Sequence, residues 1–454
     1  MRILLVNPKP TQGYTVYGPS LGLCYLSAYL KANGFPQVEG IDLNTDTQAE
    51  FESAIIRSDL VGIYCSTKAL NQTIELAQKA RNAGKVVVVG GPHPSVLPEE
   101  VMAAPAVDYV VLAEGEETFL ALANSLKIGG SFQDIDGLGY KQNGEIIINP
   151  RKKYIEDLDS IPFPDRKLFN FDYSKVITFC ATRGCPYKCS NCQPALSMQT
   201  CKFRLRSVEN VLDELKQVAV GKTVHFVDND LTVNKRWIRK LCESILSEGL
   251  HFSWGCQGRI NTLNADIMSL MKKAGCIGVG VGIESGSQEL LDTLLRKQLS
   301  LVRAKEVISE SCQIGLPLHG WFIVGIPGET KVDMEKTMEF ALSHPFATIG
   351  FSIGTPWPGT LFYQRARENG WLTSDNWENY NEKRHSCLRT NDWGPEDIQL
   401  IRERMFREFR KKGWVVDASD FFFVNPSWGR GPLKTILYRQ YKKFAFFKKN
   451  ILKR

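Results

Sequence analysis

The first part of the chain alternates short apolar runs with stretches of helix length. The runs are rich in β-branched residues and show no strict alternation of apolar and polar positions, which is typical of parallel strands buried on both faces. This pattern predicts a doubly wound, Rossmann-like α/β domain over residues 1–128. The apolar runs occupy residues 2–6, 60–64, 86–90 and 108–113.

Polar, turn-rich segments follow these predicted strands. Their sequences are "NPKP", "CSTKA", "GGPHPS" and "EGEE". In open α/β sheets, ligands bind at the carboxyl ends of the strands. We therefore expect this edge of the first domain to form a binding site.

A second series of apolar runs begins after a segment rich in Gly, Pro and charged residues. That segment, residues 129–172, is predicted to form a small hairpin and an extended linker. Each later run is followed by enough residues for a helix, which predicts a partial (β/α)6 barrel of the TIM type over residues 173–360. The runs cover residues 175–180, 223–228, 251–256, 277–283, 319–325 and 347–353.

The chain becomes rich in aromatic residues after the predicted barrel. We expect residues 361–454 to form a mainly α-helical cap that shapes the substrate site, although an ordinary cap with an aromatic core explains these residues equally well. Its end, residues 432–454, holds eight Lys and Arg and no acidic residue. The apolar residues between these charges have helical spacing, which predicts a basic amphipathic helix suited to an anionic membrane surface. Docking onto the protein body and a solvated end are open alternatives.

Composition and charge narrow the class of protein. The chain has 454 residues and a 43% apolar share, enough for two hydrophobic cores and an appendage. The net charge of +7 becomes 7 − 8 = −1 without the basic end, so positive charge is confined there and nucleic-acid binding is disfavoured. The start, "MRILLVNP", has only a short apolar run before a Pro and no small-residue cleavage site, so we expect no signal peptide. No stretch approaches the roughly 18 continuous apolar residues of a membrane span. We expect a cytoplasmic protein, with membrane association through the basic end as an open alternative.

The most informative motif is "RGCPYKCSNCQ", directly after the first predicted barrel strand. It holds Cys185, Cys189 and Cys192. Three thiolates can bind three corners of a [4Fe–4S] cluster and leave one iron open as a binding site. A structural zinc ion usually needs four protein ligands, and the nearest further cysteines, Cys180 and Cys201, lie at unpatterned distances. The motif therefore favours a [4Fe–4S] cluster over zinc.

This cysteine spacing, at the first strand of a barrel, resembles that of the radical S-adenosylmethionine enzymes. With the α/β domain ahead of it, the chain is similar to the cobalamin-binding subgroup of that family over about residues 1–360. The resemblance implies that S-adenosylmethionine chelates the open iron, and that an electron from the cluster cleaves it to a 5′-deoxyadenosyl radical. It also implies an electron donor such as flavodoxin or ferredoxin.

Polar residues at the ends of the next two predicted barrel strands agree with this resemblance. Asp228, Asn229 and Asp230 match the place where the family contacts the amino group of S-adenosylmethionine. Arg259 is suited to the carboxylate, since a guanidinium can pair with a carboxylate bidentately. A solvated loop explains any one of these residues alone, but not their occurrence at successive strand ends.

The ends of the fourth and fifth predicted strands extend the same resemblance. Glu284, followed by Ser285, matches the place where the family binds the ribose hydroxyls of S-adenosylmethionine. Gly325 and Pro327 belong to a Gly-rich stretch that resembles the family's contact with the adenine. We expect these residues to bind the nucleoside part of the cofactor.

One position departs from the family pattern. The family usually has an aromatic residue immediately before the third cysteine, where it packs on the adenine. Here that position is Asn191, and Tyr187 is the candidate substitute.

The resemblance also implies cobalamin between the α/β domain and the barrel. Ser66, Thr67, Gly91 and His93 follow front strands and are expected to lie near it. The chain lacks the Asp-x-His-x-x-Gly motif that supplies a lower axial ligand, because His93 follows Gly91 and not an Asp. The lower ligand would then be water, another side chain or none. A turn histidine bonded to the backbone explains His93 equally well.

The first functional hypothesis is a cobalamin-dependent radical S-adenosylmethionine methyltransferase acting on an unactivated carbon of a small-molecule or lipid-like metabolite. As the resemblance implies, one S-adenosylmethionine methylates cob(I)alamin, a second gives the radical, and methylcobalamin delivers the methyl group. A second hypothesis is ring closure or rearrangement with the same cofactors. A third is a front domain that serves as a cobalamin-free docking module. Methylthiotransferases are excluded, because they need three further cysteines in the N-terminal domain, which holds only Cys24 and Cys65.

Overall fold

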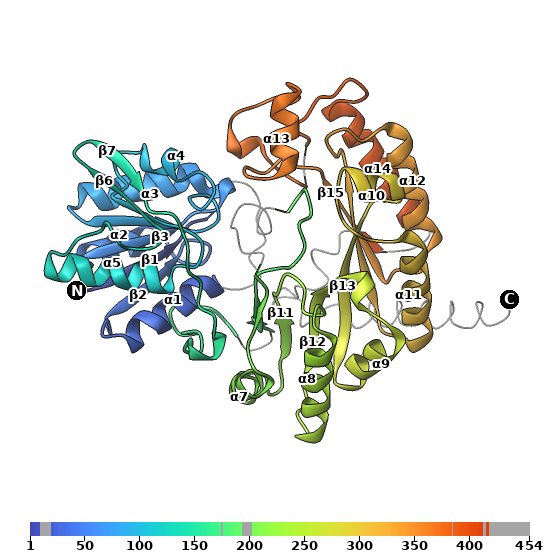
Figure 1. Ribbon diagram of the computed structural model, residues 1–454, viewed down its shortest axis with the longest axis horizontal. Helices are drawn as coiled ribbons and strands as arrows, with labels where there is room; N and C mark the ends of the chain where they lie inside the picture. The colour runs from blue at the N-terminus through green and yellow to red at the C-terminus, as the bar shows by residue number, and fades with distance from the viewer. Residues whose placement is uncertain (10–19, 174–175, 193–201, 384, 412–414, 417–454) are drawn as a thin grey trace.

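The computed structural model describes residues 1–9, 20–173, 176–192, 202–383, 385–411 and 415–416. The chain forms two α/β units side by side, the first blue to cyan and the second green to orange (Figure 1). The predicted amphipathic helix over residues 432–454 lies outside the described residues. No helix in the described part is long and apolar enough to span a membrane.

The first unit is a seven-stranded sheet in the order β2-β1-β3-β4-β5-β6-β7. Strands β1 to β5 pair in parallel, whereas β6 and β7 continue the sheet antiparallel. The predicted hairpin therefore exists, and it extends the front sheet. The strands are β1 (Ile3–Asn7), β2 (Val38–Asp42), β3 (Leu60–Tyr64), β4 (Val86–Gly90), β5 (Tyr109–Val111), β6 (Leu138–Gln142) and β7 (Glu145–Ile148). The helices are α1 (Leu21–Ala32), α2 (Gln48–Arg57), η1 (Thr67–Ala69), α3 (Leu70–Asn82), α4 (Pro98–Met102) and α5 (Glu116–Ile128).

The central strands of this sheet are buried on both faces. Leu4 and Val6 of β1 point to one face and pack with α2, α3 and α4. Ile3 and Leu5 point to the other face and pack with α1 and α5. Because side chains alternate along a strand, two covered faces require apolar residues at successive positions, which explains the unbroken apolar runs.

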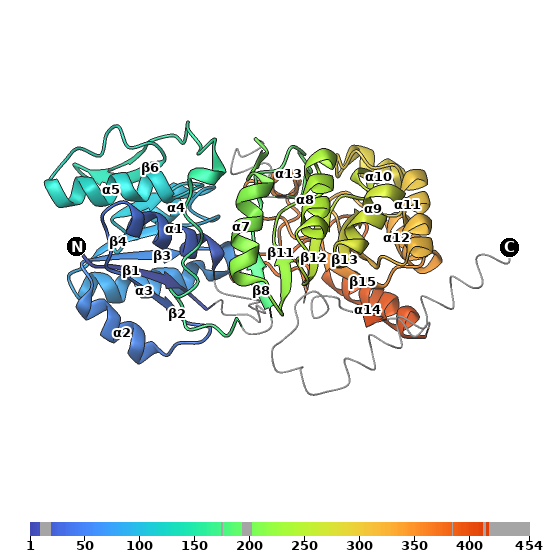
Figure 2. The same ribbon diagram turned by 90° about the horizontal axis from the view of Figure 1, so that it is seen from below.

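The second unit is a parallel sheet of seven strands in the order β16-β15-β14-β13-β12-β11-β8. All six predicted barrel strands are present, and β8 and β16 stand at opposite edges, so the barrel is partial. Figure 2 shows the helices of this unit lined up along one side of the strands. The strands are β8 (Val176–Phe179), β11 (Thr223–Phe226), β12 (Ser253–Gly258), β13 (Cys276–Glu284), β14 (Leu318–Val324), β15 (Thr348–Ile353) and β16 (Val415–Val416). The helices are α7 (Val208–Val218), α8 (Lys235–Ser247), η3 (Ile260–Thr262), α9 (Ala265–Lys273), α10 (Gln288–Thr293), α11 (Leu301–Ile314) and α12 (Lys331–Ser343).

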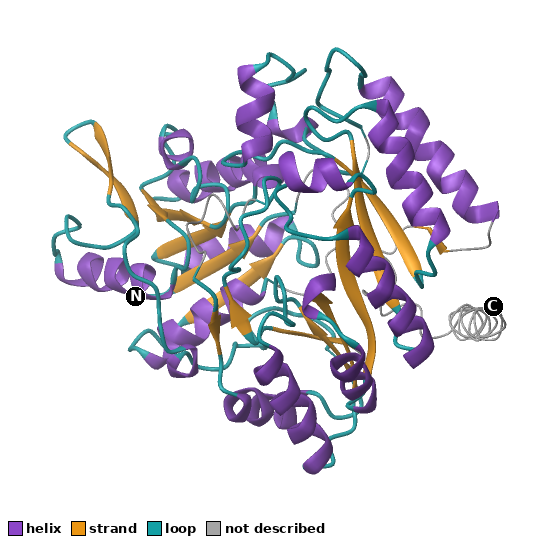
Figure 3. Cartoon of the chain, turned by 45° about the vertical axis from the view of Figure 1, so that its right-hand side comes forward, coloured by secondary structure: helices purple, strands orange, loops and turns teal. Residues whose placement is uncertain are grey.

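Short elements complete the fold. The two-stranded sheet of β9 (Thr182–Arg183) and β10 (Arg204–Leu205) closes the base of the cysteine loop, and η2 (Leu158–Ser160) lies in the linker. The described part of the cap is mainly helical, as predicted. Figure 3 shows the strands of both units between helices. Its elements are α13 (Leu361–Glu368), η4 (Trp377–Asn379) and α14 (Pro395–Lys411).

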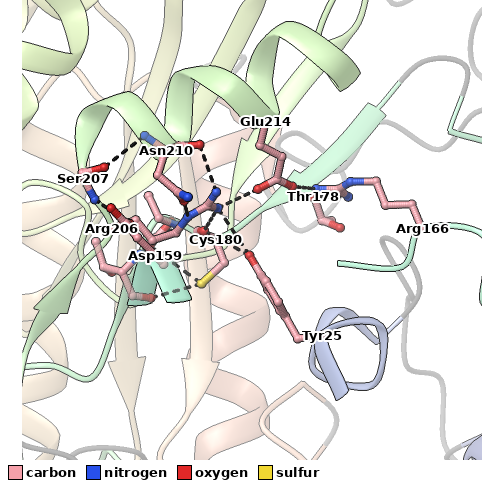
Figure 4. Close-up of polar contacts among 12 residues, drawn as sticks. Tyr25, Asp159, Arg166, Thr178, Cys180, Arg206, Ser207, Asn210 and Glu214 are labelled. Carbon is pink, nitrogen blue, oxygen red and sulfur yellow. Dashed lines mark hydrogen bonds and ion pairs between the residues drawn. The ribbon is translucent and has the colours of Figure 1, made fainter. Parts of the chain in front are cut away.

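A buried ionic network joins the two units through the linker (Figure 4). The Glu214 carboxylate of α7 accepts from Arg166 Nη2 of the linker at 2.7 Å and from Arg206 Nη1 at 2.6 Å. Arg206 Nη1 also lies 3.0 Å from the Cys180 carbonyl oxygen and 3.4 Å from the Tyr25 hydroxyl of α1. The end of β8 is thus fastened to both the first helix of the front unit and the first helix of the barrel.

The cap also contacts the front unit, at α4 and η1. Trp377 Nε1 of η4 donates to Glu100 Oε1 of α4 at 2.8 Å. Lys68 Nζ forms an ion pair of 2.6 Å with Glu382, a residue of the cap. The cap therefore holds the front unit at a place separate from the network around Glu214.

Candidate functional site

The cysteine loop leaves the carboxyl end of β8, where barrel enzymes place their chemistry. Cys189 is buried, and Cys185 and Cys192 are half-buried. The backbone holds the loop in place, since Ser190 N donates to the Leu295 carbonyl at 3.0 Å. Within the described residues, no three His, Cys, Asp or Glu side chains converge on a single metal ion. In a cubane cluster each thiolate binds a different iron, so its ligands do not share one ion.

Arg259, immediately after β12, lies against this loop. Its Nη1 donates to Cys189 Sγ at 3.4 Å, and its guanidinium lies 3.9 Å from the centre of the Tyr187 ring. Arg259 is only 6% exposed, and its Nε and Nη2 have no hydrogen-bond partner among the described residues.

Two carboxylates after β11 are buried nearby. Asp228 Oδ1 accepts from the backbone N of Ala181 at 3.0 Å and of Thr182 at 2.5 Å. Asp230 Oδ1 accepts from Thr232 N at 2.9 Å. The Oδ2 atom of each aspartate has no partner within the described part of the chain. Burial raises the pKa of Asp228 to about 6 and also raises the pKa of Asp230.

These unpaired buried atoms fit the amino-acid end of S-adenosylmethionine. Buried polar groups without a partner are rare and call for a ligand or another explanation. The free donors of Arg259 suit a carboxylate, and the free acceptors of Asp228 and Asp230 suit an ammonium group. Asn229, between them, is exposed and lines the large cavity described below. Their assignment to S-adenosylmethionine stays a prediction.

Glu284 has an unusual backbone conformation at the end of β13. Its φ is +70°, and the pairing of β13 with β14 shifts register at this residue. A left-handed conformation in a residue other than Gly, Asn or Asp is uncommon and clusters at functional sites. The Glu284 carboxylate pairs with Lys297 Nζ at 2.5 Å. The Ser285 hydroxyl instead lies 3.0 Å from Thr337 Oγ1 of α12, so it is engaged within the protein.

The Gly-rich turn after β14 is held by a carboxylate that sequence reasoning missed. Glu329 Oε2 accepts from the backbone N of Gly325 at 2.7 Å and of Ile326 at 2.9 Å. Gly325 has a φ of +80°, which favours glycine. Burial raises the pKa of Glu329 to about 8. Pro327, in the same turn, accepts a 3.2 Å hydrogen bond from Arg365 Nη1 at its carbonyl.

A cavity of about 440 Å³ lies between the carboxyl ends of the two sheets. Gly62 of β3 lines it beside Leu5 and Phe119, and an added Cβ would lie 3.0 Å from both Leu5 Cδ2 and Phe119 Cε2. The walls are mostly apolar, with charged groups at the junction of the two units. Apolar walls at the strand ends suit the face of a corrin ring. Among its lining residues are Leu5, Gly62, Tyr64, Val88, Gly91, Glu114, Glu116 and Phe119 from the front unit and Cys180, Arg183, Asp228 and Asn229 from the barrel.

Of the four residues predicted near cobalamin, one lines this cavity. Ser66, Thr67 and His93 are not among the residues lining this cavity, whereas Gly91 is. His93 Nδ1 lies 3.2 Å from Thr67 Oγ1, and the His93 ring packs edge-on against Trp377 of the cap at 5.8 Å between centroids. Burial lowers the pKa of His93. In this arrangement His93 contributes to the contact between the front unit and the cap.

Replacing Arg259 with methionine should weaken binding of S-adenosylmethionine. Hydrogen bonds to a charged group contribute about 1.5–3 kcal/mol, which corresponds to a rise in Kd of about 10- to 100-fold. The rise is measured by equilibrium binding to the iron-loaded protein. Arg239→Met on the outer surface of α8, where the side chain is 46% exposed, is the matched control and should leave the Kd unchanged. If the variant instead loses iron, and the protein that keeps its cluster binds S-adenosylmethionine with an unchanged Kd, then Arg259 supports Cys189 and not the cofactor.

Models of two protein families match the sequence. The B12 binding domain matches residues 14–123, and the Radical SAM superfamily matches residues 179–341. An uncharacterised methyltransferase of Pyrococcus horikoshii is 34% identical over 401 residues, covering 84% of this chain and 86% of the relative. The anaerobic magnesium-protoporphyrin IX monomethyl ester cyclase of Rubrivivax gelatinosus is 28% identical, covering 80% of this chain and 70% of the relative.

Solved structures agree on the fold. One is the radical S-adenosylmethionine methyltransferase TsrM from Kitasatospora setae with cobalamin and a [4Fe–4S] cluster bound. Its TM-score with this chain is 0.70 at 15% identity, and the superposition covers 100% of each chain. At this identity the likeness concerns the fold alone. The matched domains and the relative at 34% identity confirm the family that the sequence resembles. The chain belongs to the cobalamin-binding radical S-adenosylmethionine enzymes, whose cofactors are a [4Fe–4S] cluster, S-adenosylmethionine and cobalamin.

Proposed function

We propose that the protein is a cobalamin-dependent methyltransferase that acts on an unactivated carbon of a small-molecule or lipid-like metabolite. The observation that carries this proposal is one continuous cavity that reaches from the front sheet to Asp228 and Asn229 of the barrel. A corrinoid there would share one space with the residues assigned to S-adenosylmethionine. The methyltransferase named among its relatives, at 34% identity, supports the same activity.

In this proposal the protein's own residues bind, orient and exclude water. Cys185, Cys189 and Cys192 hold the cluster, and Arg259 with Asp228 orients S-adenosylmethionine on it. When bound, these cofactors supply a carbon-centred radical, and cobalamin supplies the methyl group. The apolar walls of the cavity exclude water from the reaction.

Ring closure with the same cofactors is the second candidate. It is favoured by the similarity to the Rubrivivax gelatinosus cyclase over 80% of this chain. The two functions differ in the fate of the methyl group, since only a methyltransferase consumes it. The third hypothesis, a cobalamin-free front domain, loses its support because a B12 binding domain matches residues 14–123.

The test is anaerobic reconstitution of the full chain with iron, sulfide and hydroxocobalamin, followed by desalting. We expect about four irons and one corrinoid per chain. With a reductant and S-adenosylmethionine, we expect both S-adenosylhomocysteine, the sign of methyl transfer, and 5′-deoxyadenosine, the sign of radical formation. Production of 5′-deoxyadenosine alone would overturn methyl transfer and favour ring closure.

A variant that fills the cavity provides the control for this test. Gly62→Val adds atoms where a Cβ alone would already lie 3.0 Å from Leu5 and Phe119. We expect this variant to lose bound corrinoid and S-adenosylhomocysteine formation. It should keep its iron, because β3 contributes no ligand to the cluster.

A further inference from the structure

Four charged residues meet where the front unit contacts the base of the cysteine loop. Glu114 and Glu116 come from the "EGEE" segment, which follows β5 and runs into the start of α5. Arg183 belongs to β9 and Arg204 to β10, so the two arginines stand at opposite ends of the loop that carries the cysteines. We call these four residues the charge clasp.

The contacts within the charge clasp are direct. Arg183 Nη2 lies 2.6 Å from Glu116 Oε1, and Arg183 Nη1 lies 3.4 Å from Glu114 Oε2. Arg204 Nη1 donates to Glu114 Oε2 at 3.0 Å, and Arg204 Nη2 pairs with Glu114 Oε1. Arg183 and Arg204 also face each other across the antiparallel pair β9 and β10. Glu114 of the front unit is therefore shared by both ends of the loop.

Burial makes this arrangement sensitive to any change. The side chains of the charge clasp are between 4% and 16% exposed. A buried charge that loses its partner carries a large desolvation cost, so each member depends on the others. Forked guanidinium contacts to a carboxylate add geometric specificity to the charge pairing. The base of the cysteine loop thus depends on a glutamate that belongs to the other unit.

The charge clasp also forms part of the wall of the large cavity. Glu114, Glu116 and Arg183 are among the residues that line it. Arg183 is two residues before Cys185, the first cysteine of the motif. The corrin ring of cobalamin carries amide side chains, which both donate and accept hydrogen bonds. A corrinoid in the cavity would therefore touch the same side chains that hold the loop.

We propose that the charge clasp couples cobalamin binding in the cavity to the order of the cysteine loop. Bound cobalamin restrains the loop, and an assembled cluster tightens cobalamin binding. Because coupling between two binding sites is reciprocal, bound cobalamin should raise the affinity of the loop for the cluster by the same factor. This inference rests on the proposed function only in that the cavity binds cobalamin.

The test compares the Kd of hydroxocobalamin for the full chain before and after assembly of the cluster. Couplings between sites are typically about 5- to 150-fold, and we expect at least about a 5-fold tightening in the unaltered protein. Glu114→Gln removes the shared charge and should bring the ratio of the two Kd values close to one. Glu117→Gln is the matched control, since Glu117 belongs to the same segment, is 49% exposed and has its ion pair with Arg151.

A second measurement reports on the loop without any cofactor. Lys188 is exposed within the cysteine loop, and trypsin cleavage after it is followed by mass spectrometry. We expect faster cleavage in Glu114→Gln and in Arg183→Lys, which keeps the charge but loses the two nitrogens that contact Glu114 and Glu116 separately. We expect no change in Glu117→Gln. Hydroxocobalamin should slow cleavage in the unaltered protein and in Glu117→Gln only. The circular dichroism spectrum of each variant shows whether it is folded.

The outcomes separate this inference from the proposed function. If the unaltered protein binds cobalamin with the same Kd with and without cluster, the coupling is wrong and the proposed function stands. If Glu114→Gln keeps the full ratio, the charge clasp is not its cause. If the unaltered protein binds no cobalamin, the proposed function and the coupling both fail. An unchanged cleavage rate in Glu114→Gln and Arg183→Lys would then show that the charge clasp does not hold the loop either.

Discussion

Replacing Cys189 with alanine is expected to reduce bound iron from about four atoms per chain to about zero and to end production of 5′-deoxyadenosine. Cys189 is the most buried of the three cysteines and the one that Arg259 contacts. Two remaining thiolates cannot hold a cubane cluster in a site that offers three. Cys185→Ala and Cys192→Ala should have the same effect. Iron and sulfide are quantified after anaerobic reconstitution, together with the nucleoside product.

Cys180→Ala is the control for this experiment. Cys180 is the nearest described cysteine outside the motif, and its Sγ lies 3.1 Å from the Thr182 carbonyl oxygen. The variant should keep its iron, because Cys180 lies outside the three-cysteine motif. Retention of both iron and product in Cys189→Ala would remove the cluster from this loop. Loss of metal in Cys180→Ala as well would point to a four-cysteine site.

Replacing Glu214 with alanine is expected to lower the free energy of unfolding by about 3–5 kcal/mol, since it leaves buried charges without their partner. Glu214 is 1% exposed and pairs with both Arg166 and Arg206. Arg206 has two aromatic neighbours, Phe163 and Phe179, at 5.3 Å and 5.2 Å, so its guanidinium cannot readily turn to water. Urea unfolding followed by circular dichroism measures the change.

The same helix offers a control for this prediction. Glu209 of α7 pairs with Lys240 at 2.5 Å, but both side chains are more than half exposed. Exposed ion pairs contribute little, so Glu209→Ala should leave the unfolding midpoint almost unchanged. Equal effects of the two substitutions would mean that the buried network adds no stability beyond the propensity of the helix.

The sequence predicted most of the fold because parallel strands buried on both faces leave a strong local signal. All six barrel strands and four of the front strands lie where the apolar runs do. Strand β2 was missed, because its sequence "VEGID" carries two acidic residues and it stands at the edge of the sheet. The attachment of β6 and β7 to the front sheet was missed as well, because strand pairing is a tertiary property that no local pattern records.

The candidate site divides in the same way. The cysteines, Asp228 and Arg259 could be proposed because each follows a strand that the pattern locates. The charge clasp could not, since its glutamates and arginines are about 70 to 90 residues apart and meet only in the folded chain. His93 follows β4, and its ring contacts Thr67 and Trp377; its place near cobalamin stays a prediction.

The antiparallel strand β6 has a consequence for anyone who wishes to isolate the front unit. It pairs with β5 through Tyr109, Val110 and Val111 and covers the flank of that strand. A fragment that ended before β6 would expose unpaired backbone groups along an apolar strand, and such a flank recruits strands from other molecules. A recombinant piece that stops before the hairpin would therefore tend to aggregate. One that runs past Ile148 carries its own protection against it.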